Sequence, residues 1–398
     1  MNPVSNELPE KGHVVIIGGG PGGTACALAL DRLAVQMGRQ VHITLLEGKQ
    51  FKGERHYNQC VGVLSPPLPE LLEDRLDIRF PKHLCLMEID GYVLHSADDE
   101  ILLQGDHDNS FALRRVQFDE YMLDAVIQRG IPLLPARAVD LEFNEDGVIV
   151  YTENTSLEAD VVVGAFGLDE GSISMFKRTT SYRPPKSLNS IVTKYVPYAD
   201  SEIDFGTYIH AFLPNHPKIE FGGITPKCSH VTINIAGQAI DAPLMQEFLK
   251  HSEVRAVLAD YEQDASVLSE QPLLFKGRFP CSLAQNYYGD RYIMVGDAAG
   301  LVRAFKGKGA TTAVLTGIRA AETIMQHGVS AQAFHQHYRN DNHEIINDLP
   351  YGRVMRLVAI YVSRLGLLDT IIRAARQSPD LRSALFLSLI HISEPTRQ

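Results

Sequence analysis

Hydrophobic residues in the first 50 positions are grouped around one glycine-rich turn. Residues 13–17 form a continuous, β-branched run of the kind that is buried on both faces of a parallel sheet. The turn at residues 18–23 leads into residues 24–36, which are rich in alanine and leucine and predict a helix. Residues 41–46 form a second apolar strand. This order predicts a βαβ half-unit with a right-handed crossover, as in Rossmann-like α/β domains.

The pattern changes after the second strand. Residues 51–104 are irregular and rich in proline, with a strand-like run at residues 91–95, which predicts an excursion into a second domain. Residues 190–276 alternate between apolar and polar positions, which predicts an antiparallel sheet with a helix near residues 242–251. Further elements of the first domain are predicted at residues 116–129 and 309–325 (helices) and at residues 131–134, 138–143, 148–151, 160–164 and 292–297 (strands).

This order predicts two interleaved domains followed by helices. The α/β, Rossmann-like cofactor domain with its parallel sheet is expected at residues 12–60, 105–180 and 281–330. The antiparallel-sheet substrate domain is expected at residues 61–104 and 181–280. A disordered N-terminus is predicted at residues 1–11, and a helical C-terminal segment at residues 331–386.

The last residues have an unusual sequence. Residues 387–397, LSLIHISEPTR, resemble the translation of a sequencing adapter rather than natural coding sequence. We therefore expect residues 387–398 to be an adapter-derived tail of a metagenomic assembly, with the natural C-terminus missing.

Charge and cysteine usage narrow the classes of protein. The formal net charge is -11 and no basic cluster is interleaved with aromatic residues, so we expect no nucleic-acid partner. The five cysteines are scattered without a CxxC pair, and no apolar signal segment begins the chain. These features favour a reducing cytoplasm.

The most apolar long segment is residues 354–375. Because Arg356, Arg364 and Arg373 interrupt it, we expect no transmembrane span. Apolar residues nevertheless recur at helical spacing from Met355 to Ala375, with arginines on one side. Two alternatives remain open: the helix covers a lipid-like channel or contacts a membrane surface, or it is buried against the cofactor domain, which we favour.

The glycine-rich turn has the spacing Gly-x-Gly-x-x-Gly of a dinucleotide site. Such a turn brings backbone close to a pyrophosphate, and the following helix N-terminus stabilises the phosphate charge. Glu47 ends the second strand, where its carboxylate can accept hydrogen bonds from ribose hydroxyls. The residues expected to contact the nucleotide are Gly18, Gly20, Pro21, Gly22, Gly23 and Glu47.

A second motif, residues 296–300 (GDAAG), ends a predicted strand and precedes FKGKG and a helix. Together with the first turn it resembles the FAD signature of glutathione-reductase-type proteins and of the p-hydroxybenzoate-hydroxylase-like fold. The resemblance implies FAD, with Asp297 on the ribityl chain and the helix N-terminus at the flavin pyrimidine. The implied contacts are Gly296, Asp297, Gly307, Gly309 and Ala310; Lys306 and Lys308 either stabilise reduced flavin or lie solvated at the surface.

Two further positions are assigned to the same cofactor site. Arg115-Val-Gln-Phe-Asp119 resembles the R-x-x-F-D segment of these families, which implies an arginine near the cofactor. A surface arginine beside an amphipathic helix is the alternative. Ala138, at the start of a predicted strand, is also expected to bind the cofactor.

Residues 58–65 (NQCVGVLS) resemble the Cys-Gly-Gly-containing segment of geranylgeranyl reductases, which reduce isoprenoid double bonds. The resemblance extends over most of residues 13–330. It implies that Cys60 and Gly62 lie by the isoalloxazine ring. For Cys60, a role as a small buried hydrophobe is equally open.

The substrate segment departs from that family. Its signature Y-x-W-x-F-P, followed by G-x-G, is replaced by residues 208–214 (YIHAFLP) and the adjacent Gly222 and Gly223. The substrate is therefore left open. Cys60, Tyr208 and His210 are the expected catalytic residues, and His56 and Tyr57 are further candidates to line the pocket.

The function expected from these motifs is hydride transfer from reduced FAD to a carbon–carbon double bond of an isoprenoid or lipid-like substrate. The electron donor is expected to be NAD(P)H or a ferredoxin-like protein. The main alternative is a flavin-dependent monooxygenase on a small hydrophobic substrate. Aromatic hydroxylases of this fold share a Gly-Ala-Asp-Gly segment, however, and here Phe166 replaces the aspartate, which lowers this alternative. A flavin carrier without turnover is a third.

Two other site types are not expected. A halogenase of this fold needs a W-x-W-x-I-P segment, and the chain has no tryptophan. The densest histidine group is His335, His337 and His343 on the C-terminal helices. Because residues two apart do not share a helix face, we expect a solvated surface there and no metal site.

Overall fold

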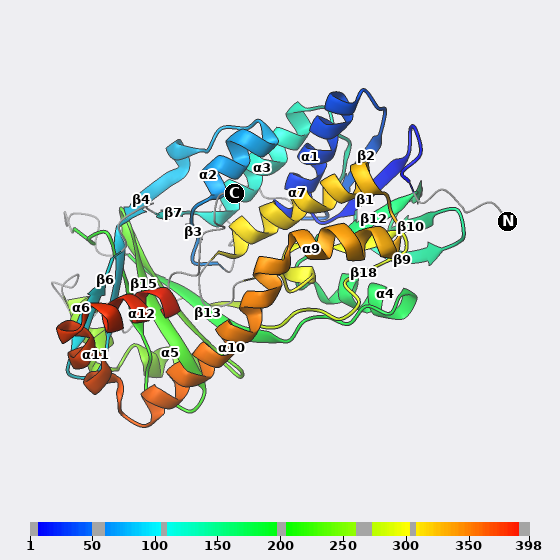
Figure 1. The fold of residues 1–398 in the computed structure, drawn as a ribbon. Coiled ribbons are helices and arrows are strands. Elements are labelled where there is room, and N and C mark those ends of the chain that lie inside the picture. Colours follow the sequence, from blue (N-terminus) through cyan, green and yellow to red (C-terminus); the bar gives the residue numbers. More distant parts are fainter. Residues whose placement is uncertain are drawn as a thin grey trace.

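The computed structural model describes residues 7–49, 60–104, 110–196, 204–259, 273–302 and 308–389 (Figure 1). A mostly parallel sheet has the strand order β18-β19-β12-β1-β2-β8. In its centre β1 (His13–Ile17) pairs in parallel with β2 (His42–Leu46) on one side and with β12 (Val161–Gly164) on the other. The outer strands are β8 (Leu133–Leu134), β18 (Tyr288–Gly289) and β19 (Tyr292–Met294). The predicted Rossmann-like α/β fold is confirmed.

Two long helices lie side by side on this sheet (Figure 1). Helix α1 (Pro21–Met37) begins with a proline, whose fixed φ suits the first helical position, and ends at Gly38 in the left-handed region. Helix α7 (Gly309–His327) contacts it without an intervening side chain, because a Cβ on Gly317 would lie 2.2 Å from the carbonyl oxygen of Gly22. The glycine-rich turn is thereby fixed against α7.

Smaller elements complete this half of the molecule. A three-stranded sheet consists of β9 (Ala138–Phe143), β10 (Val148–Thr152) and β11 (Ser156–Ala159). Another consists of β3 (Val63–Leu64), β7 (Ser110–Leu113) and β4 (Cys85–Ile89). The remaining helical elements are α2 (Leu68–Glu70), η1 (Leu71–Arg75), η2 (Lys82–Leu84), α3 (Arg115–Gln128), α4 (Glu170–Thr179), η4 (Gly296–Ala298), α8 (Ala331–Ala333), η5 (Phe334–Tyr338) and α9 (Arg339–Asp341).

A larger, mainly antiparallel sheet, called the large sheet below, has the order β17-β13-β16-β15-β14-β5-β6. Its strands are β17 (Phe275–Pro280), β13 (Ser187–Tyr195), β16 (His230–Gly237), β15 (Ile219–Lys227), β14 (Tyr208–Phe212), β5 (Gly91–His95) and β6 (Glu100–Leu103). The predicted antiparallel sheet is thus confirmed, with one exception: β14 and β5 run parallel.

Successive residues of a strand point to opposite faces, so the large sheet has two distinct sides. On the side that we call the α5 face, Phe212, Ile224 and Ile233 pack in an apolar core with α5 (Ala242–Phe248) and α6 (Ser252–Ala259). The opposite side, which we call the Lys227 face, carries Lys194, Thr225, Lys227, His230 and Thr232. Both faces are needed to locate the predicted site residues.

The C-terminal segment is helical, as predicted. Helix α10 (His343–Arg364) runs from the Rossmann-like half to the far end of the large sheet, where α11 (Leu368–Gln377) and α12 (Pro379–Leu389) lie beside β6 (Figure 1). Leu368 and Ile372 of α11 are buried against β5 and β6. In the described ranges no helix combines the length and apolar character needed to cross a membrane.

The favoured burial of this segment against the cofactor domain is wrong. On α10, the side chains of Tyr351, Val354 and Leu365 are 71%, 57% and 69% exposed. The buried residues of α11 contact the large sheet instead. The helical spacing of apolar residues predicted an amphipathic helix correctly, but spacing alone does not say which surface, if any, covers it.

Candidate functional site

The glycine-rich turn is shaped by backbone contacts that exclude side chains. Gly18 has φ of 113°, and a Cβ on it would lie 2.5 Å from the carbonyl oxygen of Ala165. A Cβ on Gly23 would lie 1.9 Å from the oxygen of Gly18. Gly20 differs, because nothing lies within 4 Å of its Cβ position. The turn is closed on the protein side and open at the N-terminus of α1, as a phosphate site requires.

Glu47 is held beside this turn by two backbone hydrogen bonds. Its Oε2 accepts from the Gly19 N–H at 2.8 Å, and its Oε1 accepts from the Lys49 N–H at 2.7 Å. The remaining lone pairs can accept from ribose hydroxyls. A Cβ on the neighbouring Gly48 would lie 2.6 Å from Cγ of Arg137, so the chain just before Ala138 also reaches this place.

The second predicted motif lies against the first. A Cβ on Gly22 would lie 3.1 Å from Cγ2 of Val295 and 3.3 Å from the oxygen of Ala313 on α7. Gly296, with φ of 56°, donates its N–H to the Thr316 hydroxyl at 2.9 Å. The segment that carries Asp297 therefore sits between the glycine turn and α7. Gly309 and Ala310 form the first turn of α7, and Pro21 the first turn of α1.

Asp297 and Arg115 share one electrostatic environment. Burial raises the pKa of Asp297 to about 6, and the charge of Arg115 acts in the opposite direction. Burial would lower the pKa of Arg115, but Asp119, Cys60 and Asp297 raise it overall. Arg115 Nε donates to Asp119 Oδ1 at 2.7 Å, which fixes the guanidinium at the start of α3. The alternative of a surface arginine is wrong.

Cys60 and Gly62 lie at the junction of the two halves. Cys60 is exposed, so the alternative of a buried hydrophobe is wrong for its thiol. Its Sγ accepts from the Gly62 N–H at 3.4 Å. Gly62 has φ of 79°, and a Cβ there would lie 2.2 Å from the oxygen of Leu113 and 3.2 Å from Nζ of Lys227. The large sheet thus reaches this segment through Lys227.

Lys227 is the residue that sequence reasoning missed. Its side chain is 3% exposed, and Nζ donates to the Leu113 carbonyl at 2.9 Å. Burial lowers the pKa of Lys227 to about 8. The available signal was a lysine in an alternating strand at a position that shares a face with Thr225. A second missed contact joins Thr311 of α7 to the Ser65 carbonyl at 2.8 Å.

The structure does not bring Tyr208 and His210 to this place. His210 lies opposite Ile224 in the strand register, so both belong to the α5 face, and Tyr208, two residues earlier, shares it. Lys227, three residues after Ile224, points to the other side. Tyr208 and His210 thus stand apart from Cys60, and their catalytic assignment stays a prediction without geometric support.

Four predicted or candidate positions lie outside the described residues: His56, Tyr57, Lys306 and Gly307. The three histidines of the C-terminal helices have separate contacts. His335 Nδ1 lies 2.9 Å from the Tyr288 hydroxyl, His337 stacks on His327, and His343 Nδ1 lies 2.7 Å from the Asn340 carbonyl. Within the described ranges no three His, Cys, Asp or Glu residues are placed to hold a metal ion.

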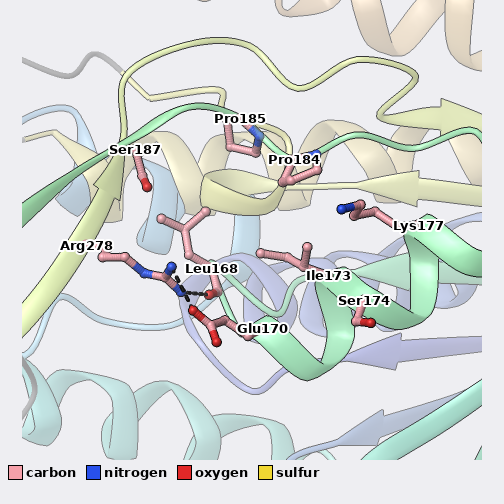
Figure 2. A pocket seen from close by; sticks show the side chains of 9 residues that line it. All are labelled: Leu168, Glu170, Ile173, Ser174, Lys177, Pro184, Pro185, Ser187 and Arg278. Carbon is pink, nitrogen blue, oxygen red and sulfur yellow. Dashed lines mark hydrogen bonds and ion pairs between the residues drawn. The ribbon is translucent and has the colours of Figure 1, made fainter. Parts of the chain in front are cut away.

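A separate pocket of about 310 Å³ lies between α4 and the start of β13 (Figure 2). Arg278 closes one side of it through an ion pair with Glu170 at 3.0 Å and a hydrogen bond to the Leu168 carbonyl at 2.9 Å. No predicted cofactor or catalytic residue lines this pocket. It is therefore distinct from the place where the two glycine motifs meet.

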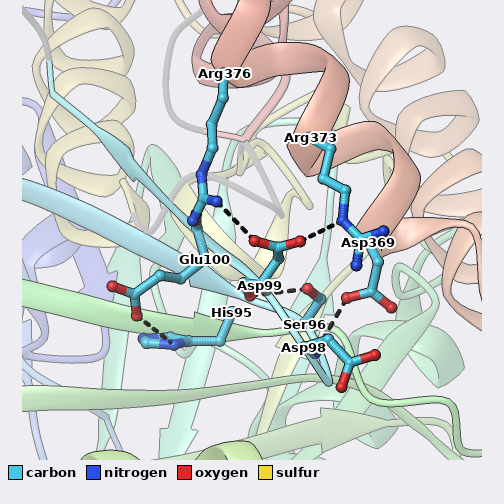
Figure 3. A network of polar contacts seen from close by, with 8 residues as sticks. All are labelled: His95, Ser96, Asp98, Asp99, Glu100, Asp369, Arg373 and Arg376. Carbon is cyan, nitrogen blue, oxygen red and sulfur yellow. Dashed lines mark hydrogen bonds and ion pairs between the residues drawn. The ribbon is translucent and has the colours of Figure 1, made fainter.

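Figure 3 shows the polar contacts around the β5–β6 turn at the edge of the large sheet. His95, whose Nε2 lies 2.8 Å from His210 Nδ1, also lies 3.3 Å from Glu100 through Nδ1. Asp99 accepts from Arg373 at 2.6 Å and from Arg376 at 2.7 Å and so joins α11 to the β5–β6 turn. These contacts are structural ties between the sheet and the C-terminal helices.

Comparison with known protein families gives no matching family model. An uncharacterized protein of Methanosarcina barkeri is 21% identical over 332 residues, which cover 79% of this chain and 75% of that protein. A probable electron transfer flavoprotein-quinone oxidoreductase of Escherichia coli is 27% identical over 164 residues. That match covers 40% of this chain and spans only 37% of the E. coli protein.

Solved structures resemble most of the chain. A geranylgeranyl bacteriochlorophyll reductase-like protein of Thermoplasma acidophilum has a TM-score of 0.64 at 17% identity, covering 94% of this chain and 98% of its own. A flavoprotein/dehydrogenase of Cytophaga hutchinsonii has a TM-score of 0.68 at 17% identity, covering 95% and 92%. The flavin-dependent brominase Bmp2 has a TM-score of 0.59 at 17% identity, covering 95% and 93%. At these identities the likeness establishes one conclusion: the chain has the fold of flavin-dependent oxidoreductases.

Proposed function

We propose that the protein is an FAD-dependent oxidoreductase that reduces carbon–carbon double bonds of an isoprenoid or lipid-like substrate. One observation carries the proposal: Gly22, Val295 and Ala313 bring the two glycine motifs into contact. A nicotinamide site needs only the first motif, whereas this arrangement offers a nucleotide site that continues past Asp297 to Cys60 and Gly62.

The described residues fit FAD in chemistry as well as in placement. The open side of Gly20 and the N-terminus of α1 would receive the pyrophosphate, and Glu47 the ribose. With a pKa of about 6, Asp297 is mostly ionised at pH 7 and can accept hydrogen bonds from ribityl hydroxyls. The N-terminus of α7 would stabilise negative charge on the flavin. When bound, FAD would supply the hydride.

The protein's own groups would then position the alkene and provide a proton. Cys60 is exposed beside Gly62, so its thiol is the proposed donor to the second carbon. Arg115, fixed by Asp119, would keep positive charge next to the reacting ring. The electron donor is proposed to be NAD(P)H or a ferredoxin-like protein.

A flavin-dependent monooxygenase is the second candidate, since a peptidyl tryptophan dihydroxylase also shares the fold with a TM-score of 0.64 at 18% identity. Phe166, however, occupies the position at which hydroxylases of this fold share an aspartate. Its ring stacks on Phe176 at 5.3 Å and meets Tyr182 edge-on at 6.3 Å. Phe166 is thus part of an aromatic cluster, which favours the reductase.

The cofactor part of the proposal is tested at Gly20. Gly20→Val places a side chain in the open space without a clash, because the backbone there is extended and nothing lies within 4 Å. We expect a folded protein that loses its flavin. Gly352→Ala, another glycine with open space around it, should keep FAD. The visible spectrum and mass spectrometry of the released cofactor measure both, and flavin retained in Gly20→Val contradicts the site.

The reaction is tested without oxygen. Enzyme reduced with dithionite under anaerobic conditions should convert an isoprenoid alkene to the saturated product, which gas chromatography detects. Product that forms only when oxygen is admitted, in step with oxygen consumption, would establish the monooxygenase instead. Flavin that is reduced but passes electrons to no alkene and no oxygen would favour a carrier.

The exposed face of α10 adds a proposed membrane contact. Tyr351, Val354, Val358, Tyr361 and Leu365 recur at helical spacing and are all more than 45% exposed. Residues 349–368 contain three arginines and neither aspartate nor glutamate, in a chain of net charge -11. Arg356 is ion-paired with Glu220, which leaves Arg353 and Arg364 as the positive charges that could meet a lipid surface. Such a segment is complementary to an anionic lipid surface, which would also hold an apolar substrate.

Vesicle flotation tests this contact. Full-length protein should float with vesicles that contain phosphatidylglycerol, and Val358→Asp should abolish flotation. Val139→Asp, at a position on β9 that is 48% exposed, is the matched control and should float like the unaltered chain. If α10 instead holds a second copy of the chain, Val358→Asp will convert a dimer to a monomer in sedimentation and no form will float.

A further inference from the structure

Basic side chains gather on the Lys227 face of the large sheet. In the strand register Lys227 of β15 lies opposite His230 of β16, and Thr232, two residues on, lies opposite both Thr225 and Lys194. Directly paired residues share a face, so these five side chains form one patch. The patch extends to the cofactor half, since Nζ of Lys227 bonds the Leu113 carbonyl next to Arg114.

The charges in this patch act on one another. The pKa of His230 is lowered to about 4, by burial first and then by Lys194, Lys227 and Arg114. Lys194 and Arg114 likewise help to lower the pKa of Lys227, after burial, while Cys60 raises it. In the described chain, no carboxylate appears among the groups that shift either residue. A buried concentration of positive charge is costly unless something negative accompanies it.

Two polar atoms in the same patch have no hydrogen-bond partner among the described residues. They are His230 Nε2 and the Thr232 hydroxyl, whose residues are 8% and 2% exposed. Buried polar groups are nearly always paired, and each orphan costs about 1–3 kcal/mol. Both atoms can donate: Nε2 when Nδ1 accepts from the Ser229 hydroxyl at 3.2 Å, and Thr232 through its O–H.

We propose that this patch is a binding site for an oxyanion, a carboxylate or phosphate ester carried by the substrate. Lys227 and Arg114 supply the charge, and His230 and Thr232 donate the hydrogen bonds that are unmade in its absence. Because Lys227 adjoins Gly62, the anionic end would be held next to Cys60. The proposal names the substrate class for the function proposed above and rests on it for the meaning of the site.

The binding step is measured without turnover. Isothermal titration at pH 7 uses two probes, inorganic pyrophosphate for a phosphate ester and octanoate for a carboxylate. The titration is done with the Gly20→Val variant. Its valine blocks the proposed nucleotide site at the N-terminus of α1, so pyrophosphate that binds is bound elsewhere, whether or not the unaltered protein carries flavin. We expect one of the two probes to bind to the unaltered patch, and the better probe identifies the substrate's head group.

Variants then assign the binding to the patch. Lys227→Met should weaken the affinity about tenfold or more, since a charged hydrogen bond is removed, and His230→Gln should weaken it severalfold. Lys276→Met, on an exposed position of the same sheet, should stay within about twofold. Circular dichroism verifies folding. Absence of binding by both probes, or equal binding by Lys227→Met and Lys276→Met, would overturn the proposal.

The outcome is separable from the proposed function. If the protein binds an oxyanion probe but shows no flavin-dependent reduction, the oxyanion site stands and the proposed oxidoreductase function is contradicted. An active reductase that binds neither probe leaves the enzyme valid and contradicts the site. Flavin content is recorded by absorbance on the unaltered chain and on each variant made in its background.

Discussion

The two faces of the large sheet differ in the hydrogen bonding of their buried histidines. On the α5 face, His95 and His210 join ring nitrogens at 2.8 Å, and His95 also meets Glu100. On the Lys227 face, Nε2 of His230 has no hydrogen-bond partner in the part of the chain that the structure describes. Burial lowers the pKa of His95 and of His230 to about 4 alike. Burial alone therefore does not distinguish the two histidines, whereas their hydrogen bonding does.

The α5 face should carry stability and little function, and Phe212 tests this with the largest effect. Its ring is 1% exposed, lies 4.9 Å from His95 and 5.7 Å from Phe248. Phe212→Ala should lower the free energy of unfolding by about 3–5 kcal/mol in urea denaturation, because a cavity remains. Oxyanion affinity of the folded fraction should not change. A tenfold loss of affinity would show that the two faces are not independent.

His230 should make stability depend on acid pH. Its folded pKa of about 4 lies below the unfolded value of 6.5, so the unfolded chain binds a proton that the folded chain does not. Stability is then lost as the pH falls from about 6.5 towards 4, by roughly 3 kcal/mol. His230→Gln should remove this share of the loss, leaving that of His95. Unfolding midpoints at pH 7 and pH 4.5 that shift equally with and without the substitution contradict the assignment.

Lys227 should act at the alkaline end. Its pKa of about 8 lies below the unfolded value of 10.5, so the folded chain releases its proton first and stability rises between pH 8 and 10.5, by about 3 kcal/mol. Lys227→Met should lack this rise. Lys276→Met corrects for other groups that titrate in the same range, and a rise of equal size in both variants would rule out a buried amine at position 227.

The sequence predicted those parts of the molecule that depend on local pattern. The apolar run at residues 13–17, the glycine spacing and Glu47 follow from the requirements of a strand–turn–helix unit, and the fold agrees. The contact of Gly22 with Val295 joins residues 273 positions apart. The resemblance assigned both motifs to one cofactor signature, but no local pattern in the sequence reveals this contact.

The remaining site residues depend on which face of the sheet a side chain occupies and on which other segments cover that face. Tyr208 and His210 were assigned by resemblance to a motif, but their register with Ile224 places them on the α5 face. Lys227 follows Pro226 at the end of a strand, and alternation places it on the same face as Thr225 but does not predict that it is 3% exposed. Its burial results from Leu113 of β7 and from Gly62, which directly precedes β3; both lie outside the large sheet. The alternation of side chains along a strand assigns residues to two faces of the sheet, but it does not say which face carries the site.

The smallest expected change in stability is that of Thr232→Val, and it tests the difference between the two faces most directly. If its hydroxyl is an orphan in the free protein, Thr232→Val removes an unpaired polar atom at nearly constant shape. The free energy of unfolding should then stay equal or rise, by up to about 1 kcal/mol, instead of falling as for a bonded hydroxyl.

The same substitution should weaken oxyanion binding severalfold, because the hydroxyl finds its partner only in the complex. Thr193→Val, whose hydroxyl donates to the Leu273 carbonyl at 2.9 Å in the same sheet, should show the reverse: lower stability and unchanged affinity. Urea denaturation and titration calorimetry on both variants measure the four quantities. Destabilisation by Thr232→Val would mean that the hydroxyl is already satisfied, and the contrast between the two faces would then rest on His230 alone.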